Sequence, residues 1–127
     1  MKRENFNAKN APDPHGGYSQ AVRLEEVKRL VLVSGQIPMD SDDKVPEGFE
    51  AQARQVWRNV EAQLKAAGMD KSNLVKVTMY LADRQYATQN REIRSDYLGA
   101  VAPALTVVIC GIFDDRWLLE VEAVAAQ

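Results

Sequence analysis

An apolar stripe between positions 46 and 67 limits the fold of this chain more than any other feature of the sequence. Its members recur every three or four residues: Phe49, Ala53, Val56, Val60, Leu64 and Ala67. This spacing predicts an amphipathic helix over 46–67, because it brings these side chains to one helix face. Pro46 favours a helix start and Gly68 a left-handed stop. A shorter helix is predicted over 86–98, ending at Gly99.

The remaining apolar segments alternate or run continuously, as strands do. Strands are predicted over 21–24, 29–37, 74–81, 104–112 and 117–125, with an irregular loop over 10–17 that is rich in Pro and Gly. The charged segment 25–28 favours a hairpin between the first two strands, and Asp114-Asp115 favours a turn between the last two. The order of elements implies an α+β fold, in which two helices pack on one face of a mixed, mainly antiparallel sheet.

The composition limits the classes of protein to which this chain can belong. The chain of 127 residues fits one domain over 1–127, and its net charge of -2 argues against a nucleic-acid partner. Cys110 is the only cysteine, so no internal disulfide forms, and the N-terminus lacks the apolar run of a secretory signal. No apolar run reaches the roughly 20 residues that a membrane span needs. We therefore expect a cytoplasmic protein with no membrane partner.

Few residues could hold a metal or a cofactor. A single histidine and a single cysteine cannot form a structural zinc site, and no glycine-rich nucleotide motif occurs. His15 with Ser19 or Ser34 could be drawn as a base and nucleophile, but their spacing matches no nucleophile motif. We expect no metal and no cofactor.

Two polar residues occupy positions where periodicity predicts burial. Asn90 shares a helix face with Ile93 and Tyr97, so its amide either bonds the backbone locally or faces a cleft. Glu120 shares a strand face with Leu118 and Val124. Either that face is solvated near a sheet edge, or desolvation disfavours the ionised carboxylate and makes it a usable acid and base.

Six segments of the sequence form a pattern of their own: Gly16–Val22, Val33–Pro38, Gln52–Val56 with Asn59, Ala66–Gly68, Val75–Thr78 and Glu120–Ala125. In register, they together resemble the RidA (YjgF) family of reactive-intermediate deaminases. The resemblance implies a chorismate-mutase-like α+β domain that forms a homotrimer. In such a trimer the three sheets form a central β-barrel, and three clefts lie between subunits.

The resemblance also implies a site and a reaction. It places Glu120 as the catalytic residue that orients and activates water. It assigns a small-molecule substrate to a cleft formed by Tyr18, Ser34, Gly35, Asn90, Leu105, Thr106 and Val107. In the family's usual reaction an enamine tautomerises to an imine, and water then releases ammonia and a 2-oxo acid.

Leu105 departs from the family pattern, in which an arginine clamps the substrate carboxylate. Arg91, Arg94 or Arg116 could supply a displaced charge, although each is expected to be a solvated surface residue. The sequence therefore predicts a divergent enamine or imine deaminase with a less acidic or bulkier substrate. The alternative is a non-catalytic trimer that binds a small molecule. Ribonuclease activity is disfavoured by the negative charge and the absence of a histidine-based acid/base pair.

Overall fold

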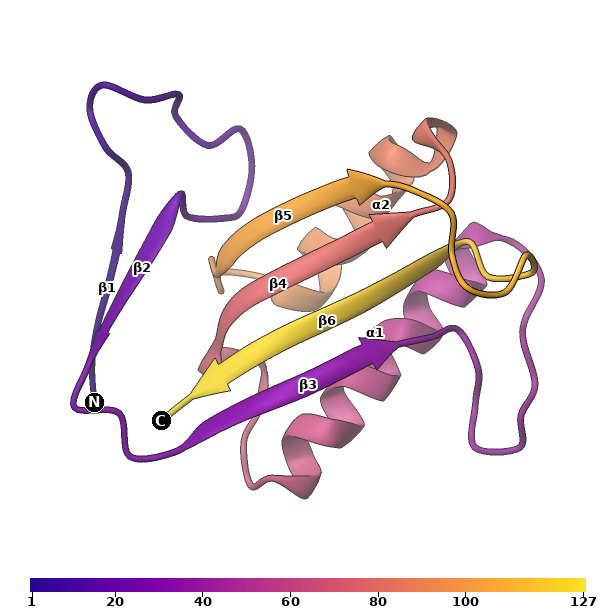
Figure 1. Cartoon of the computed structure of the whole chain (residues 1–127), viewed down its shortest axis with the longest axis horizontal. Coiled ribbons are helices and arrows are strands. Elements are labelled where there is room, and N and C mark those ends of the chain that lie inside the picture. Colours follow the sequence, from indigo (N-terminus) through magenta and orange to yellow (C-terminus); the bar gives the residue numbers. More distant parts are fainter.

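A computed structural model describes all 127 residues, and its centre is a four-stranded sheet (Figure 1). The strands lie in the order β3 (Leu30–Gln36), β6 (Leu119–Ala126), β4 (Leu74–Leu81) and β5 (Ala104–Ile109). β6 is antiparallel to both of its neighbours, whereas β4 and β5 are parallel. The predicted mixed, mainly antiparallel sheet is confirmed.

Both helices, α1 (Phe49–Ala66) and α2 (Ala87–Leu98), cover the same face of this sheet (Figure 1). α2 is the crossover between β4 and β5, which explains why these two strands are parallel. Short 3-10 turns, η1 (Lys71–Asn73) and η2 (Arg84–Tyr86), precede β4 and α2. Neither helix has the length and apolarity that a membrane span requires.

The predicted stripe of α1 forms the centre of the core. Val56, Val60 and Leu64 are completely buried against the sheet. Burial of a side chain such as Leu64 contributes about 1.5–3 kcal/mol. The helix begins at Phe49, three residues after Pro46, and it stops before Gly68, whose φ of 70° is readily adopted only by glycine.

β6 divides its side chains between the two faces of the sheet. Leu119, Val121 and Ala123 point toward the helices and are buried, whereas Glu120 and Glu122 lie on the face that no helix covers. Strand alternation therefore predicted the placement of Glu120 correctly.

The predicted hairpin through residues 25–28 is wrong. β2 (Ala21–Glu25) pairs with β1 (Lys2–Phe6), and the two form a separate ribbon beside the main sheet (Figure 1). The chain turns a corner at Glu26, which has a φ of 57°, and β3 then pairs with the C-terminal strand β6. The turn at 114–115 lies in the connection from β5 to β6, but β4 separates these two strands.

Candidate functional site

The open face of the sheet carries a hollow of about 370 Å³ around Glu120. Its lining consists of Gly35, Tyr80, Cys110, Gly111, Ile112, Glu120 and Glu122. These residues come from the ends of β3, β4 and β6 and from the segment that follows β5. The hollow therefore collects side chains at one end of the sheet.

Gly35 makes room for the Glu120 carboxylate. A Cβ atom placed on Gly35 would lie 2.0 Å from Oε1 of Glu120, far closer than any van der Waals contact. The pairing of β3 with β6 is irregular between Val33 and Gln36, so Gly35 occupies the irregular stretch. Glycine at this position is needed for the carboxylate to lie across the strand.

The carboxylate of Glu120 is electrostatically distinct from that of Glu122. Tyr80 donates a hydrogen bond of 2.7 Å from its hydroxyl to Oε1 of Glu122, whereas Glu120 is half-buried and has no hydrogen-bond partner. Burial, and secondarily the charge of Glu122, raise the pKa of Glu120 above its ordinary value. An unpaired carboxyl with a raised pKa suits proton transfer near neutral pH.

A second hollow, of about 430 Å³, lies between the loop after β1, helix α2 and strand β5. Its lining consists of His15, Tyr18, Gln20, Ala87, Asn90, Arg91, Arg94, Leu105 and Val107. Four of these residues, Tyr18, Asn90, Leu105 and Val107, were predicted as cleft residues. We call this hollow the Leu105 pocket.

Asn90 faces this pocket and does not bond the backbone. Its side chain is 2% exposed, Nδ2 lies 3.6 Å from the sulfur of Met79, and Oδ1 has no hydrogen-bond partner. A buried amide oxygen without a partner is costly unless a ligand or water satisfies it. Of the two alternatives that the sequence left open, the structure therefore favours the cleft.

Leu105 lies on the helix side of β5, opposite Val77 in the register. It is half-buried, it contacts the hydrophobic core, and it also lines the pocket. Position 105 is therefore able to contact a ligand.

The expectation that the candidate arginines are solvated surface residues is wrong for Arg94. This residue is 4% exposed and lines the Leu105 pocket. Arg91 is exposed and lines the same pocket, whereas Arg116 lies elsewhere, paired with Asp114 at 2.9 Å. The signal in the sequence was helical spacing, because Arg94 follows Asn90 by four residues and shares its face.

Two of the predicted residues line neither hollow. Thr106 points to the open face, where its hydroxyl accepts a 2.7 Å hydrogen bond from Nζ of Lys76, and it lines neither hollow. Ser34 is exposed on β3 beside Gly35. Within one chain, the predicted residues are thus divided between the two faces of the sheet.

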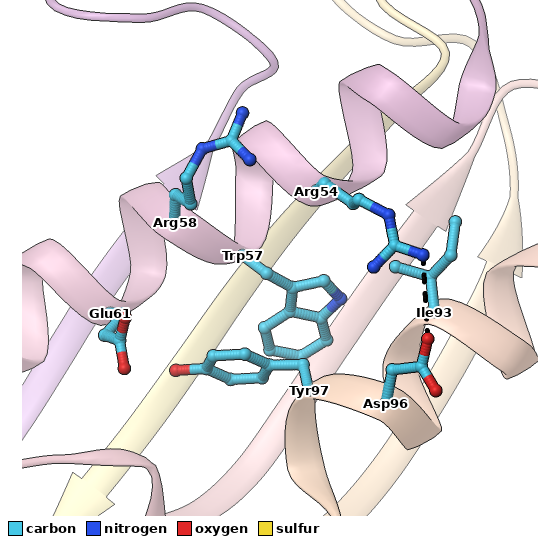
Figure 2. Close-up of a pocket in the computed structure, with 7 residues that line it drawn as sticks. All are labelled: Arg54, Trp57, Arg58, Glu61, Ile93, Asp96 and Tyr97. Atoms are coloured by element: carbon cyan, nitrogen blue, oxygen red, sulfur yellow. Dashed lines mark ion pairs between the residues drawn. The ribbon is translucent and has the colours of Figure 1, made fainter.

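A third, smaller pocket of about 220 Å³ lies between α1 and α2 (Figure 2). It contains the stacked rings of Trp57 and Tyr97, 4.5 Å apart, and the ion pair of Arg54 with Asp96 at 3.6 Å. Burial raises the pKa of Tyr97 to about 12. None of the predicted site residues lines this pocket, and no cluster of three His, Cys, Asp or Glu side chains that could hold a metal occurs in the chain.

Comparison with known proteins decides the family. The family model described as Endoribonuclease L-PSP matches residues 8–127. The chain belongs to this family, the RidA (YjgF) family. A RutC family protein of Aquifex aeolicus is 39% identical over 113 residues, covering 88% of each chain. The 2-iminobutanoate/2-iminopropanoate deaminase of Rattus norvegicus is 38% identical over 128 residues, covering 98% of this chain and 90% of the relative.

Solved structures agree with this family membership. RidA from an Antarctic Psychrobacter species is 30% identical, with a TM-score of 0.74 over 98% of this chain and 99% of that one. A Rid family protein of unknown function from Yersinia pestis has a TM-score of 0.86 over the full length of both chains. At 24% identity, this second likeness shows the fold alone. The predicted RidA-type α+β fold is confirmed.

Proposed function

We propose that this protein is an imine deaminase, which hydrolyses a reactive imine to a carbonyl compound and ammonia. The observation that carries the proposal is the Glu120 carboxyl, which lies against Gly35, is half-buried and has no hydrogen-bond partner. Its pKa is raised above the ordinary value by burial. Relatives at 35–38% identity are named 2-iminobutanoate/2-iminopropanoate deaminases, and this supports the choice of reaction. The substrate is a small molecule of the size that the two hollows admit.

Glu120 serves as a general base in this reaction. Protonation of the imine nitrogen makes the carbon electrophilic, and Glu120 removes a proton from the water that adds to it. The product of addition is a carbinolamine. Glu120 returns the proton to nitrogen and then accepts the hydroxyl proton as the C–N bond breaks, so that ammonia leaves and the carbonyl forms. Water supplies the carbonyl oxygen, so no oxidant or reductant takes part.

The complete site forms between subunits in this proposal. Glu120 and Gly35 line the hollow on the open face, whereas Tyr18, Asn90 and Leu105 line the pocket beside α2. A cyclic homotrimer, the assembly that the family resemblance implies, would bring the Glu120 hollow of one subunit to the Leu105 pocket of the next. Thr106 and Ser34 lie at the open face and would border that junction.

The proposal is tested by ammonia release from a panel of imines that an amino acid oxidase or an amine oxidase generates in place. The panel includes aliphatic, aromatic and uncharged members, because Leu105 leaves the preference open. We expect acceleration of at least one member by the wild type and its loss in Glu120→Gln. Failure of the folded wild type to accelerate any member contradicts the proposal.

A second candidate function is binding without turnover, and the observation that favours it is Leu105 in the pocket where the family has an arginine. The substitution Leu105→Arg separates the two functions. If the catalytic machinery is intact, the variant hydrolyses carboxylate-bearing imines faster than the wild type does. If a folded variant stays as inactive as the wild type, a binding or regulatory role is favoured.

A further inference from the structure

Arg94 is buried in the Leu105 pocket without a protein partner. Its side chain is 4% exposed, and no carboxylate forms an ion pair with it. Its pKa is lowered, first by burial and then by the charge of Arg91, and only Tyr18 opposes this shift. A buried guanidinium without a counter-charge is destabilising, so such residues usually meet an anion.

The surroundings of Arg94 leave space for that anion. Asn90 lies one helical turn earlier on α2, and Leu105 faces the same hollow from β5. The backbone of Gly16 lies on another side, since a Cβ placed there would be 3.9 Å from Nη2 of Arg94. The hollow of about 430 Å³ is lined by two arginines, Arg91 and Arg94, and by His15, and by no acidic side chain.

We infer that Arg94 binds the carboxylate of the substrate and so replaces, from α2, the arginine that position 105 lacks. This inference rests on the proposed function and names its substrate class, which is imines that carry a carboxylate. A guanidinium donates two parallel hydrogen bonds to a carboxylate, and this geometry fixes the orientation of the C=N group. The apolar surface of Leu105 and Val107 is left to contact the substrate side chain. Leu105 then selects the side chain, and Arg94 recognises the acid group.

Binding without turnover tests the inference. The probe is 2-oxobutanoate, the product of 2-iminobutanoate hydrolysis, and its uncharged partner is 2-oxobutanamide. Titration calorimetry of the wild type should show that the carboxylate binds at least about ten-fold more tightly than the amide. Arg94→Gln should abolish this preference. Arg94→Lys should keep part of it, because an ammonium offers the charge without the two parallel N–H donors of a guanidinium. Arg116→Gln removes an exposed arginine outside the pocket, so it should leave the preference unchanged.

A preference below about two-fold in the wild type, or an unchanged preference in folded Arg94→Gln, overturns the inference. If Arg94→Gln fails to fold, the side-chain ¹⁵N signals of the wild type decide. The Arg94 signal, assigned with Arg94→Lys, should shift on addition of 2-oxobutanoate and not on addition of the amide, and no shift with either probe overturns the inference.

The same variants separate the inference from the proposed function. A carboxylate preference that depends on Arg94, without hydrolysis of any imine, supports the anion site and contradicts the deaminase. Hydrolysis with equal kcat/KM in the wild type and Arg94→Gln supports the deaminase and overturns the role of Arg94.

Discussion

Glu120 and Glu122 lie two residues apart on the same face of β6, yet they differ in what they can do. Glu122 accepts a hydrogen bond from Tyr80, whereas Glu120 has no such partner and is held above Gly35. A hydrogen bond to a carboxylate stabilises its ionised form, and burial without one disfavours it. Burial accordingly raises the pKa of Glu120.

Glu120→Gln should lower kcat by about 10²–10⁴-fold, which is the usual contribution of a general base.

The same substitution should change the pH dependence of stability. Since folding raises the pKa of Glu120 above 4.5, the folded state binds more protons than the unfolded state in the window between the two pKa values. The free energy of unfolding of the wild type therefore decreases as pH rises through that window.

Thermal unfolding of the two proteins between pH 4 and pH 8 measures this difference. Glu120→Gln has no carboxyl to ionise, so its melting temperature should fall less than that of the wild type as pH rises. Parallel curves would show that the carboxyl is already fully solvated.

Gly35→Ala should push the Glu120 carboxylate off β3 and into water. The pKa of Glu120, followed by ¹³C NMR of labelled glutamate, should fall toward its ordinary range as desolvation is relieved. Gly17→Ala is the matched control, because a methyl group there meets no atom within 4 Å and lies outside the Glu120 hollow. An unchanged Glu120 pKa in Gly35→Ala would mean that the strand shifts to accommodate the methyl group.

Sequence reasoning could place Glu120 but not Arg94. The alternation of β6 is local, so it assigns Glu120 to a face without any knowledge of the rest of the fold. The burial of Arg94 depends on the loop after β1, which lies far away along the chain and covers α2. Helical spacing from Asn90 indicates the face of α2 on which Arg94 lies, but no local pattern reports that this loop buries it.

At the scale of elements, the N-terminal ribbon determines where Tyr18 lies. The side-chain amide of Asn5 on β1 donates hydrogen bonds to Oγ of Ser19 at 2.9 Å and to the carbonyl of Ala102 at 2.8 Å. The amide of Ser19 donates to the carbonyl of Pro103 at 3.0 Å. These bonds fasten the loop that carries Tyr18 to the segment that enters β5.

Asn5→Ala should therefore weaken substrate binding although Asn5 lies outside both hollows. The loss of its two hydrogen bonds should cost about 1–2 kcal/mol of local stability. We expect a higher KM with a smaller change in kcat, and faster hydrogen exchange at the Ser19 amide. Asn7→Ala changes the same residue type just after β1 and removes only the hydrogen bond that Asn7 accepts from the Gln20 amide. An unchanged Ser19 exchange rate in Asn5→Ala would contradict the fastening role.

The elements themselves differed in how well the sequence predicted them. α1 and β6 have strong periodicity and were predicted to within a few residues. β1 was missed because Lys2–Phe6 is mostly polar, and it forms only through pairing with β2. The hairpin error has the same origin, since the partner of a strand depends on distant residues and not on the charge of a connection.

At the scale of the whole molecule, the open sheet face carries exposed apolar side chains beside its polar ones. Leu30 and Leu32 on β3 are 57% and 73% exposed, and Val108 on β5 is 40% exposed. Leu30 and Leu32 are neighbours on one edge strand, and exposed apolar surface of this kind commonly marks an interface between protein chains. The trimer remains a prediction, and this face is the surface that it would bury.

Leu32→Glu should dissociate that assembly, because three buried carboxylates would have no partners. Light scattering should report a trimer for the wild type and a monomer for the variant. Ala51→Glu introduces the same charge on the exposed side of α1 and should leave the trimer intact. A wild type that is monomeric at micromolar concentration would contradict the assembly.

The division of the candidate residues between two hollows makes genetic complementation possible. A chain with Glu120→Gln keeps an intact Leu105 pocket. A chain in which Leu105→Trp blocks that pocket keeps an intact Glu120 carboxyl. Co-expressed in equal amounts, the two inactive chains should recover activity at about a quarter of their clefts, because each cleft of the proposed trimer takes one half from each neighbour. Two chains that are each inactive alone would together form an active enzyme.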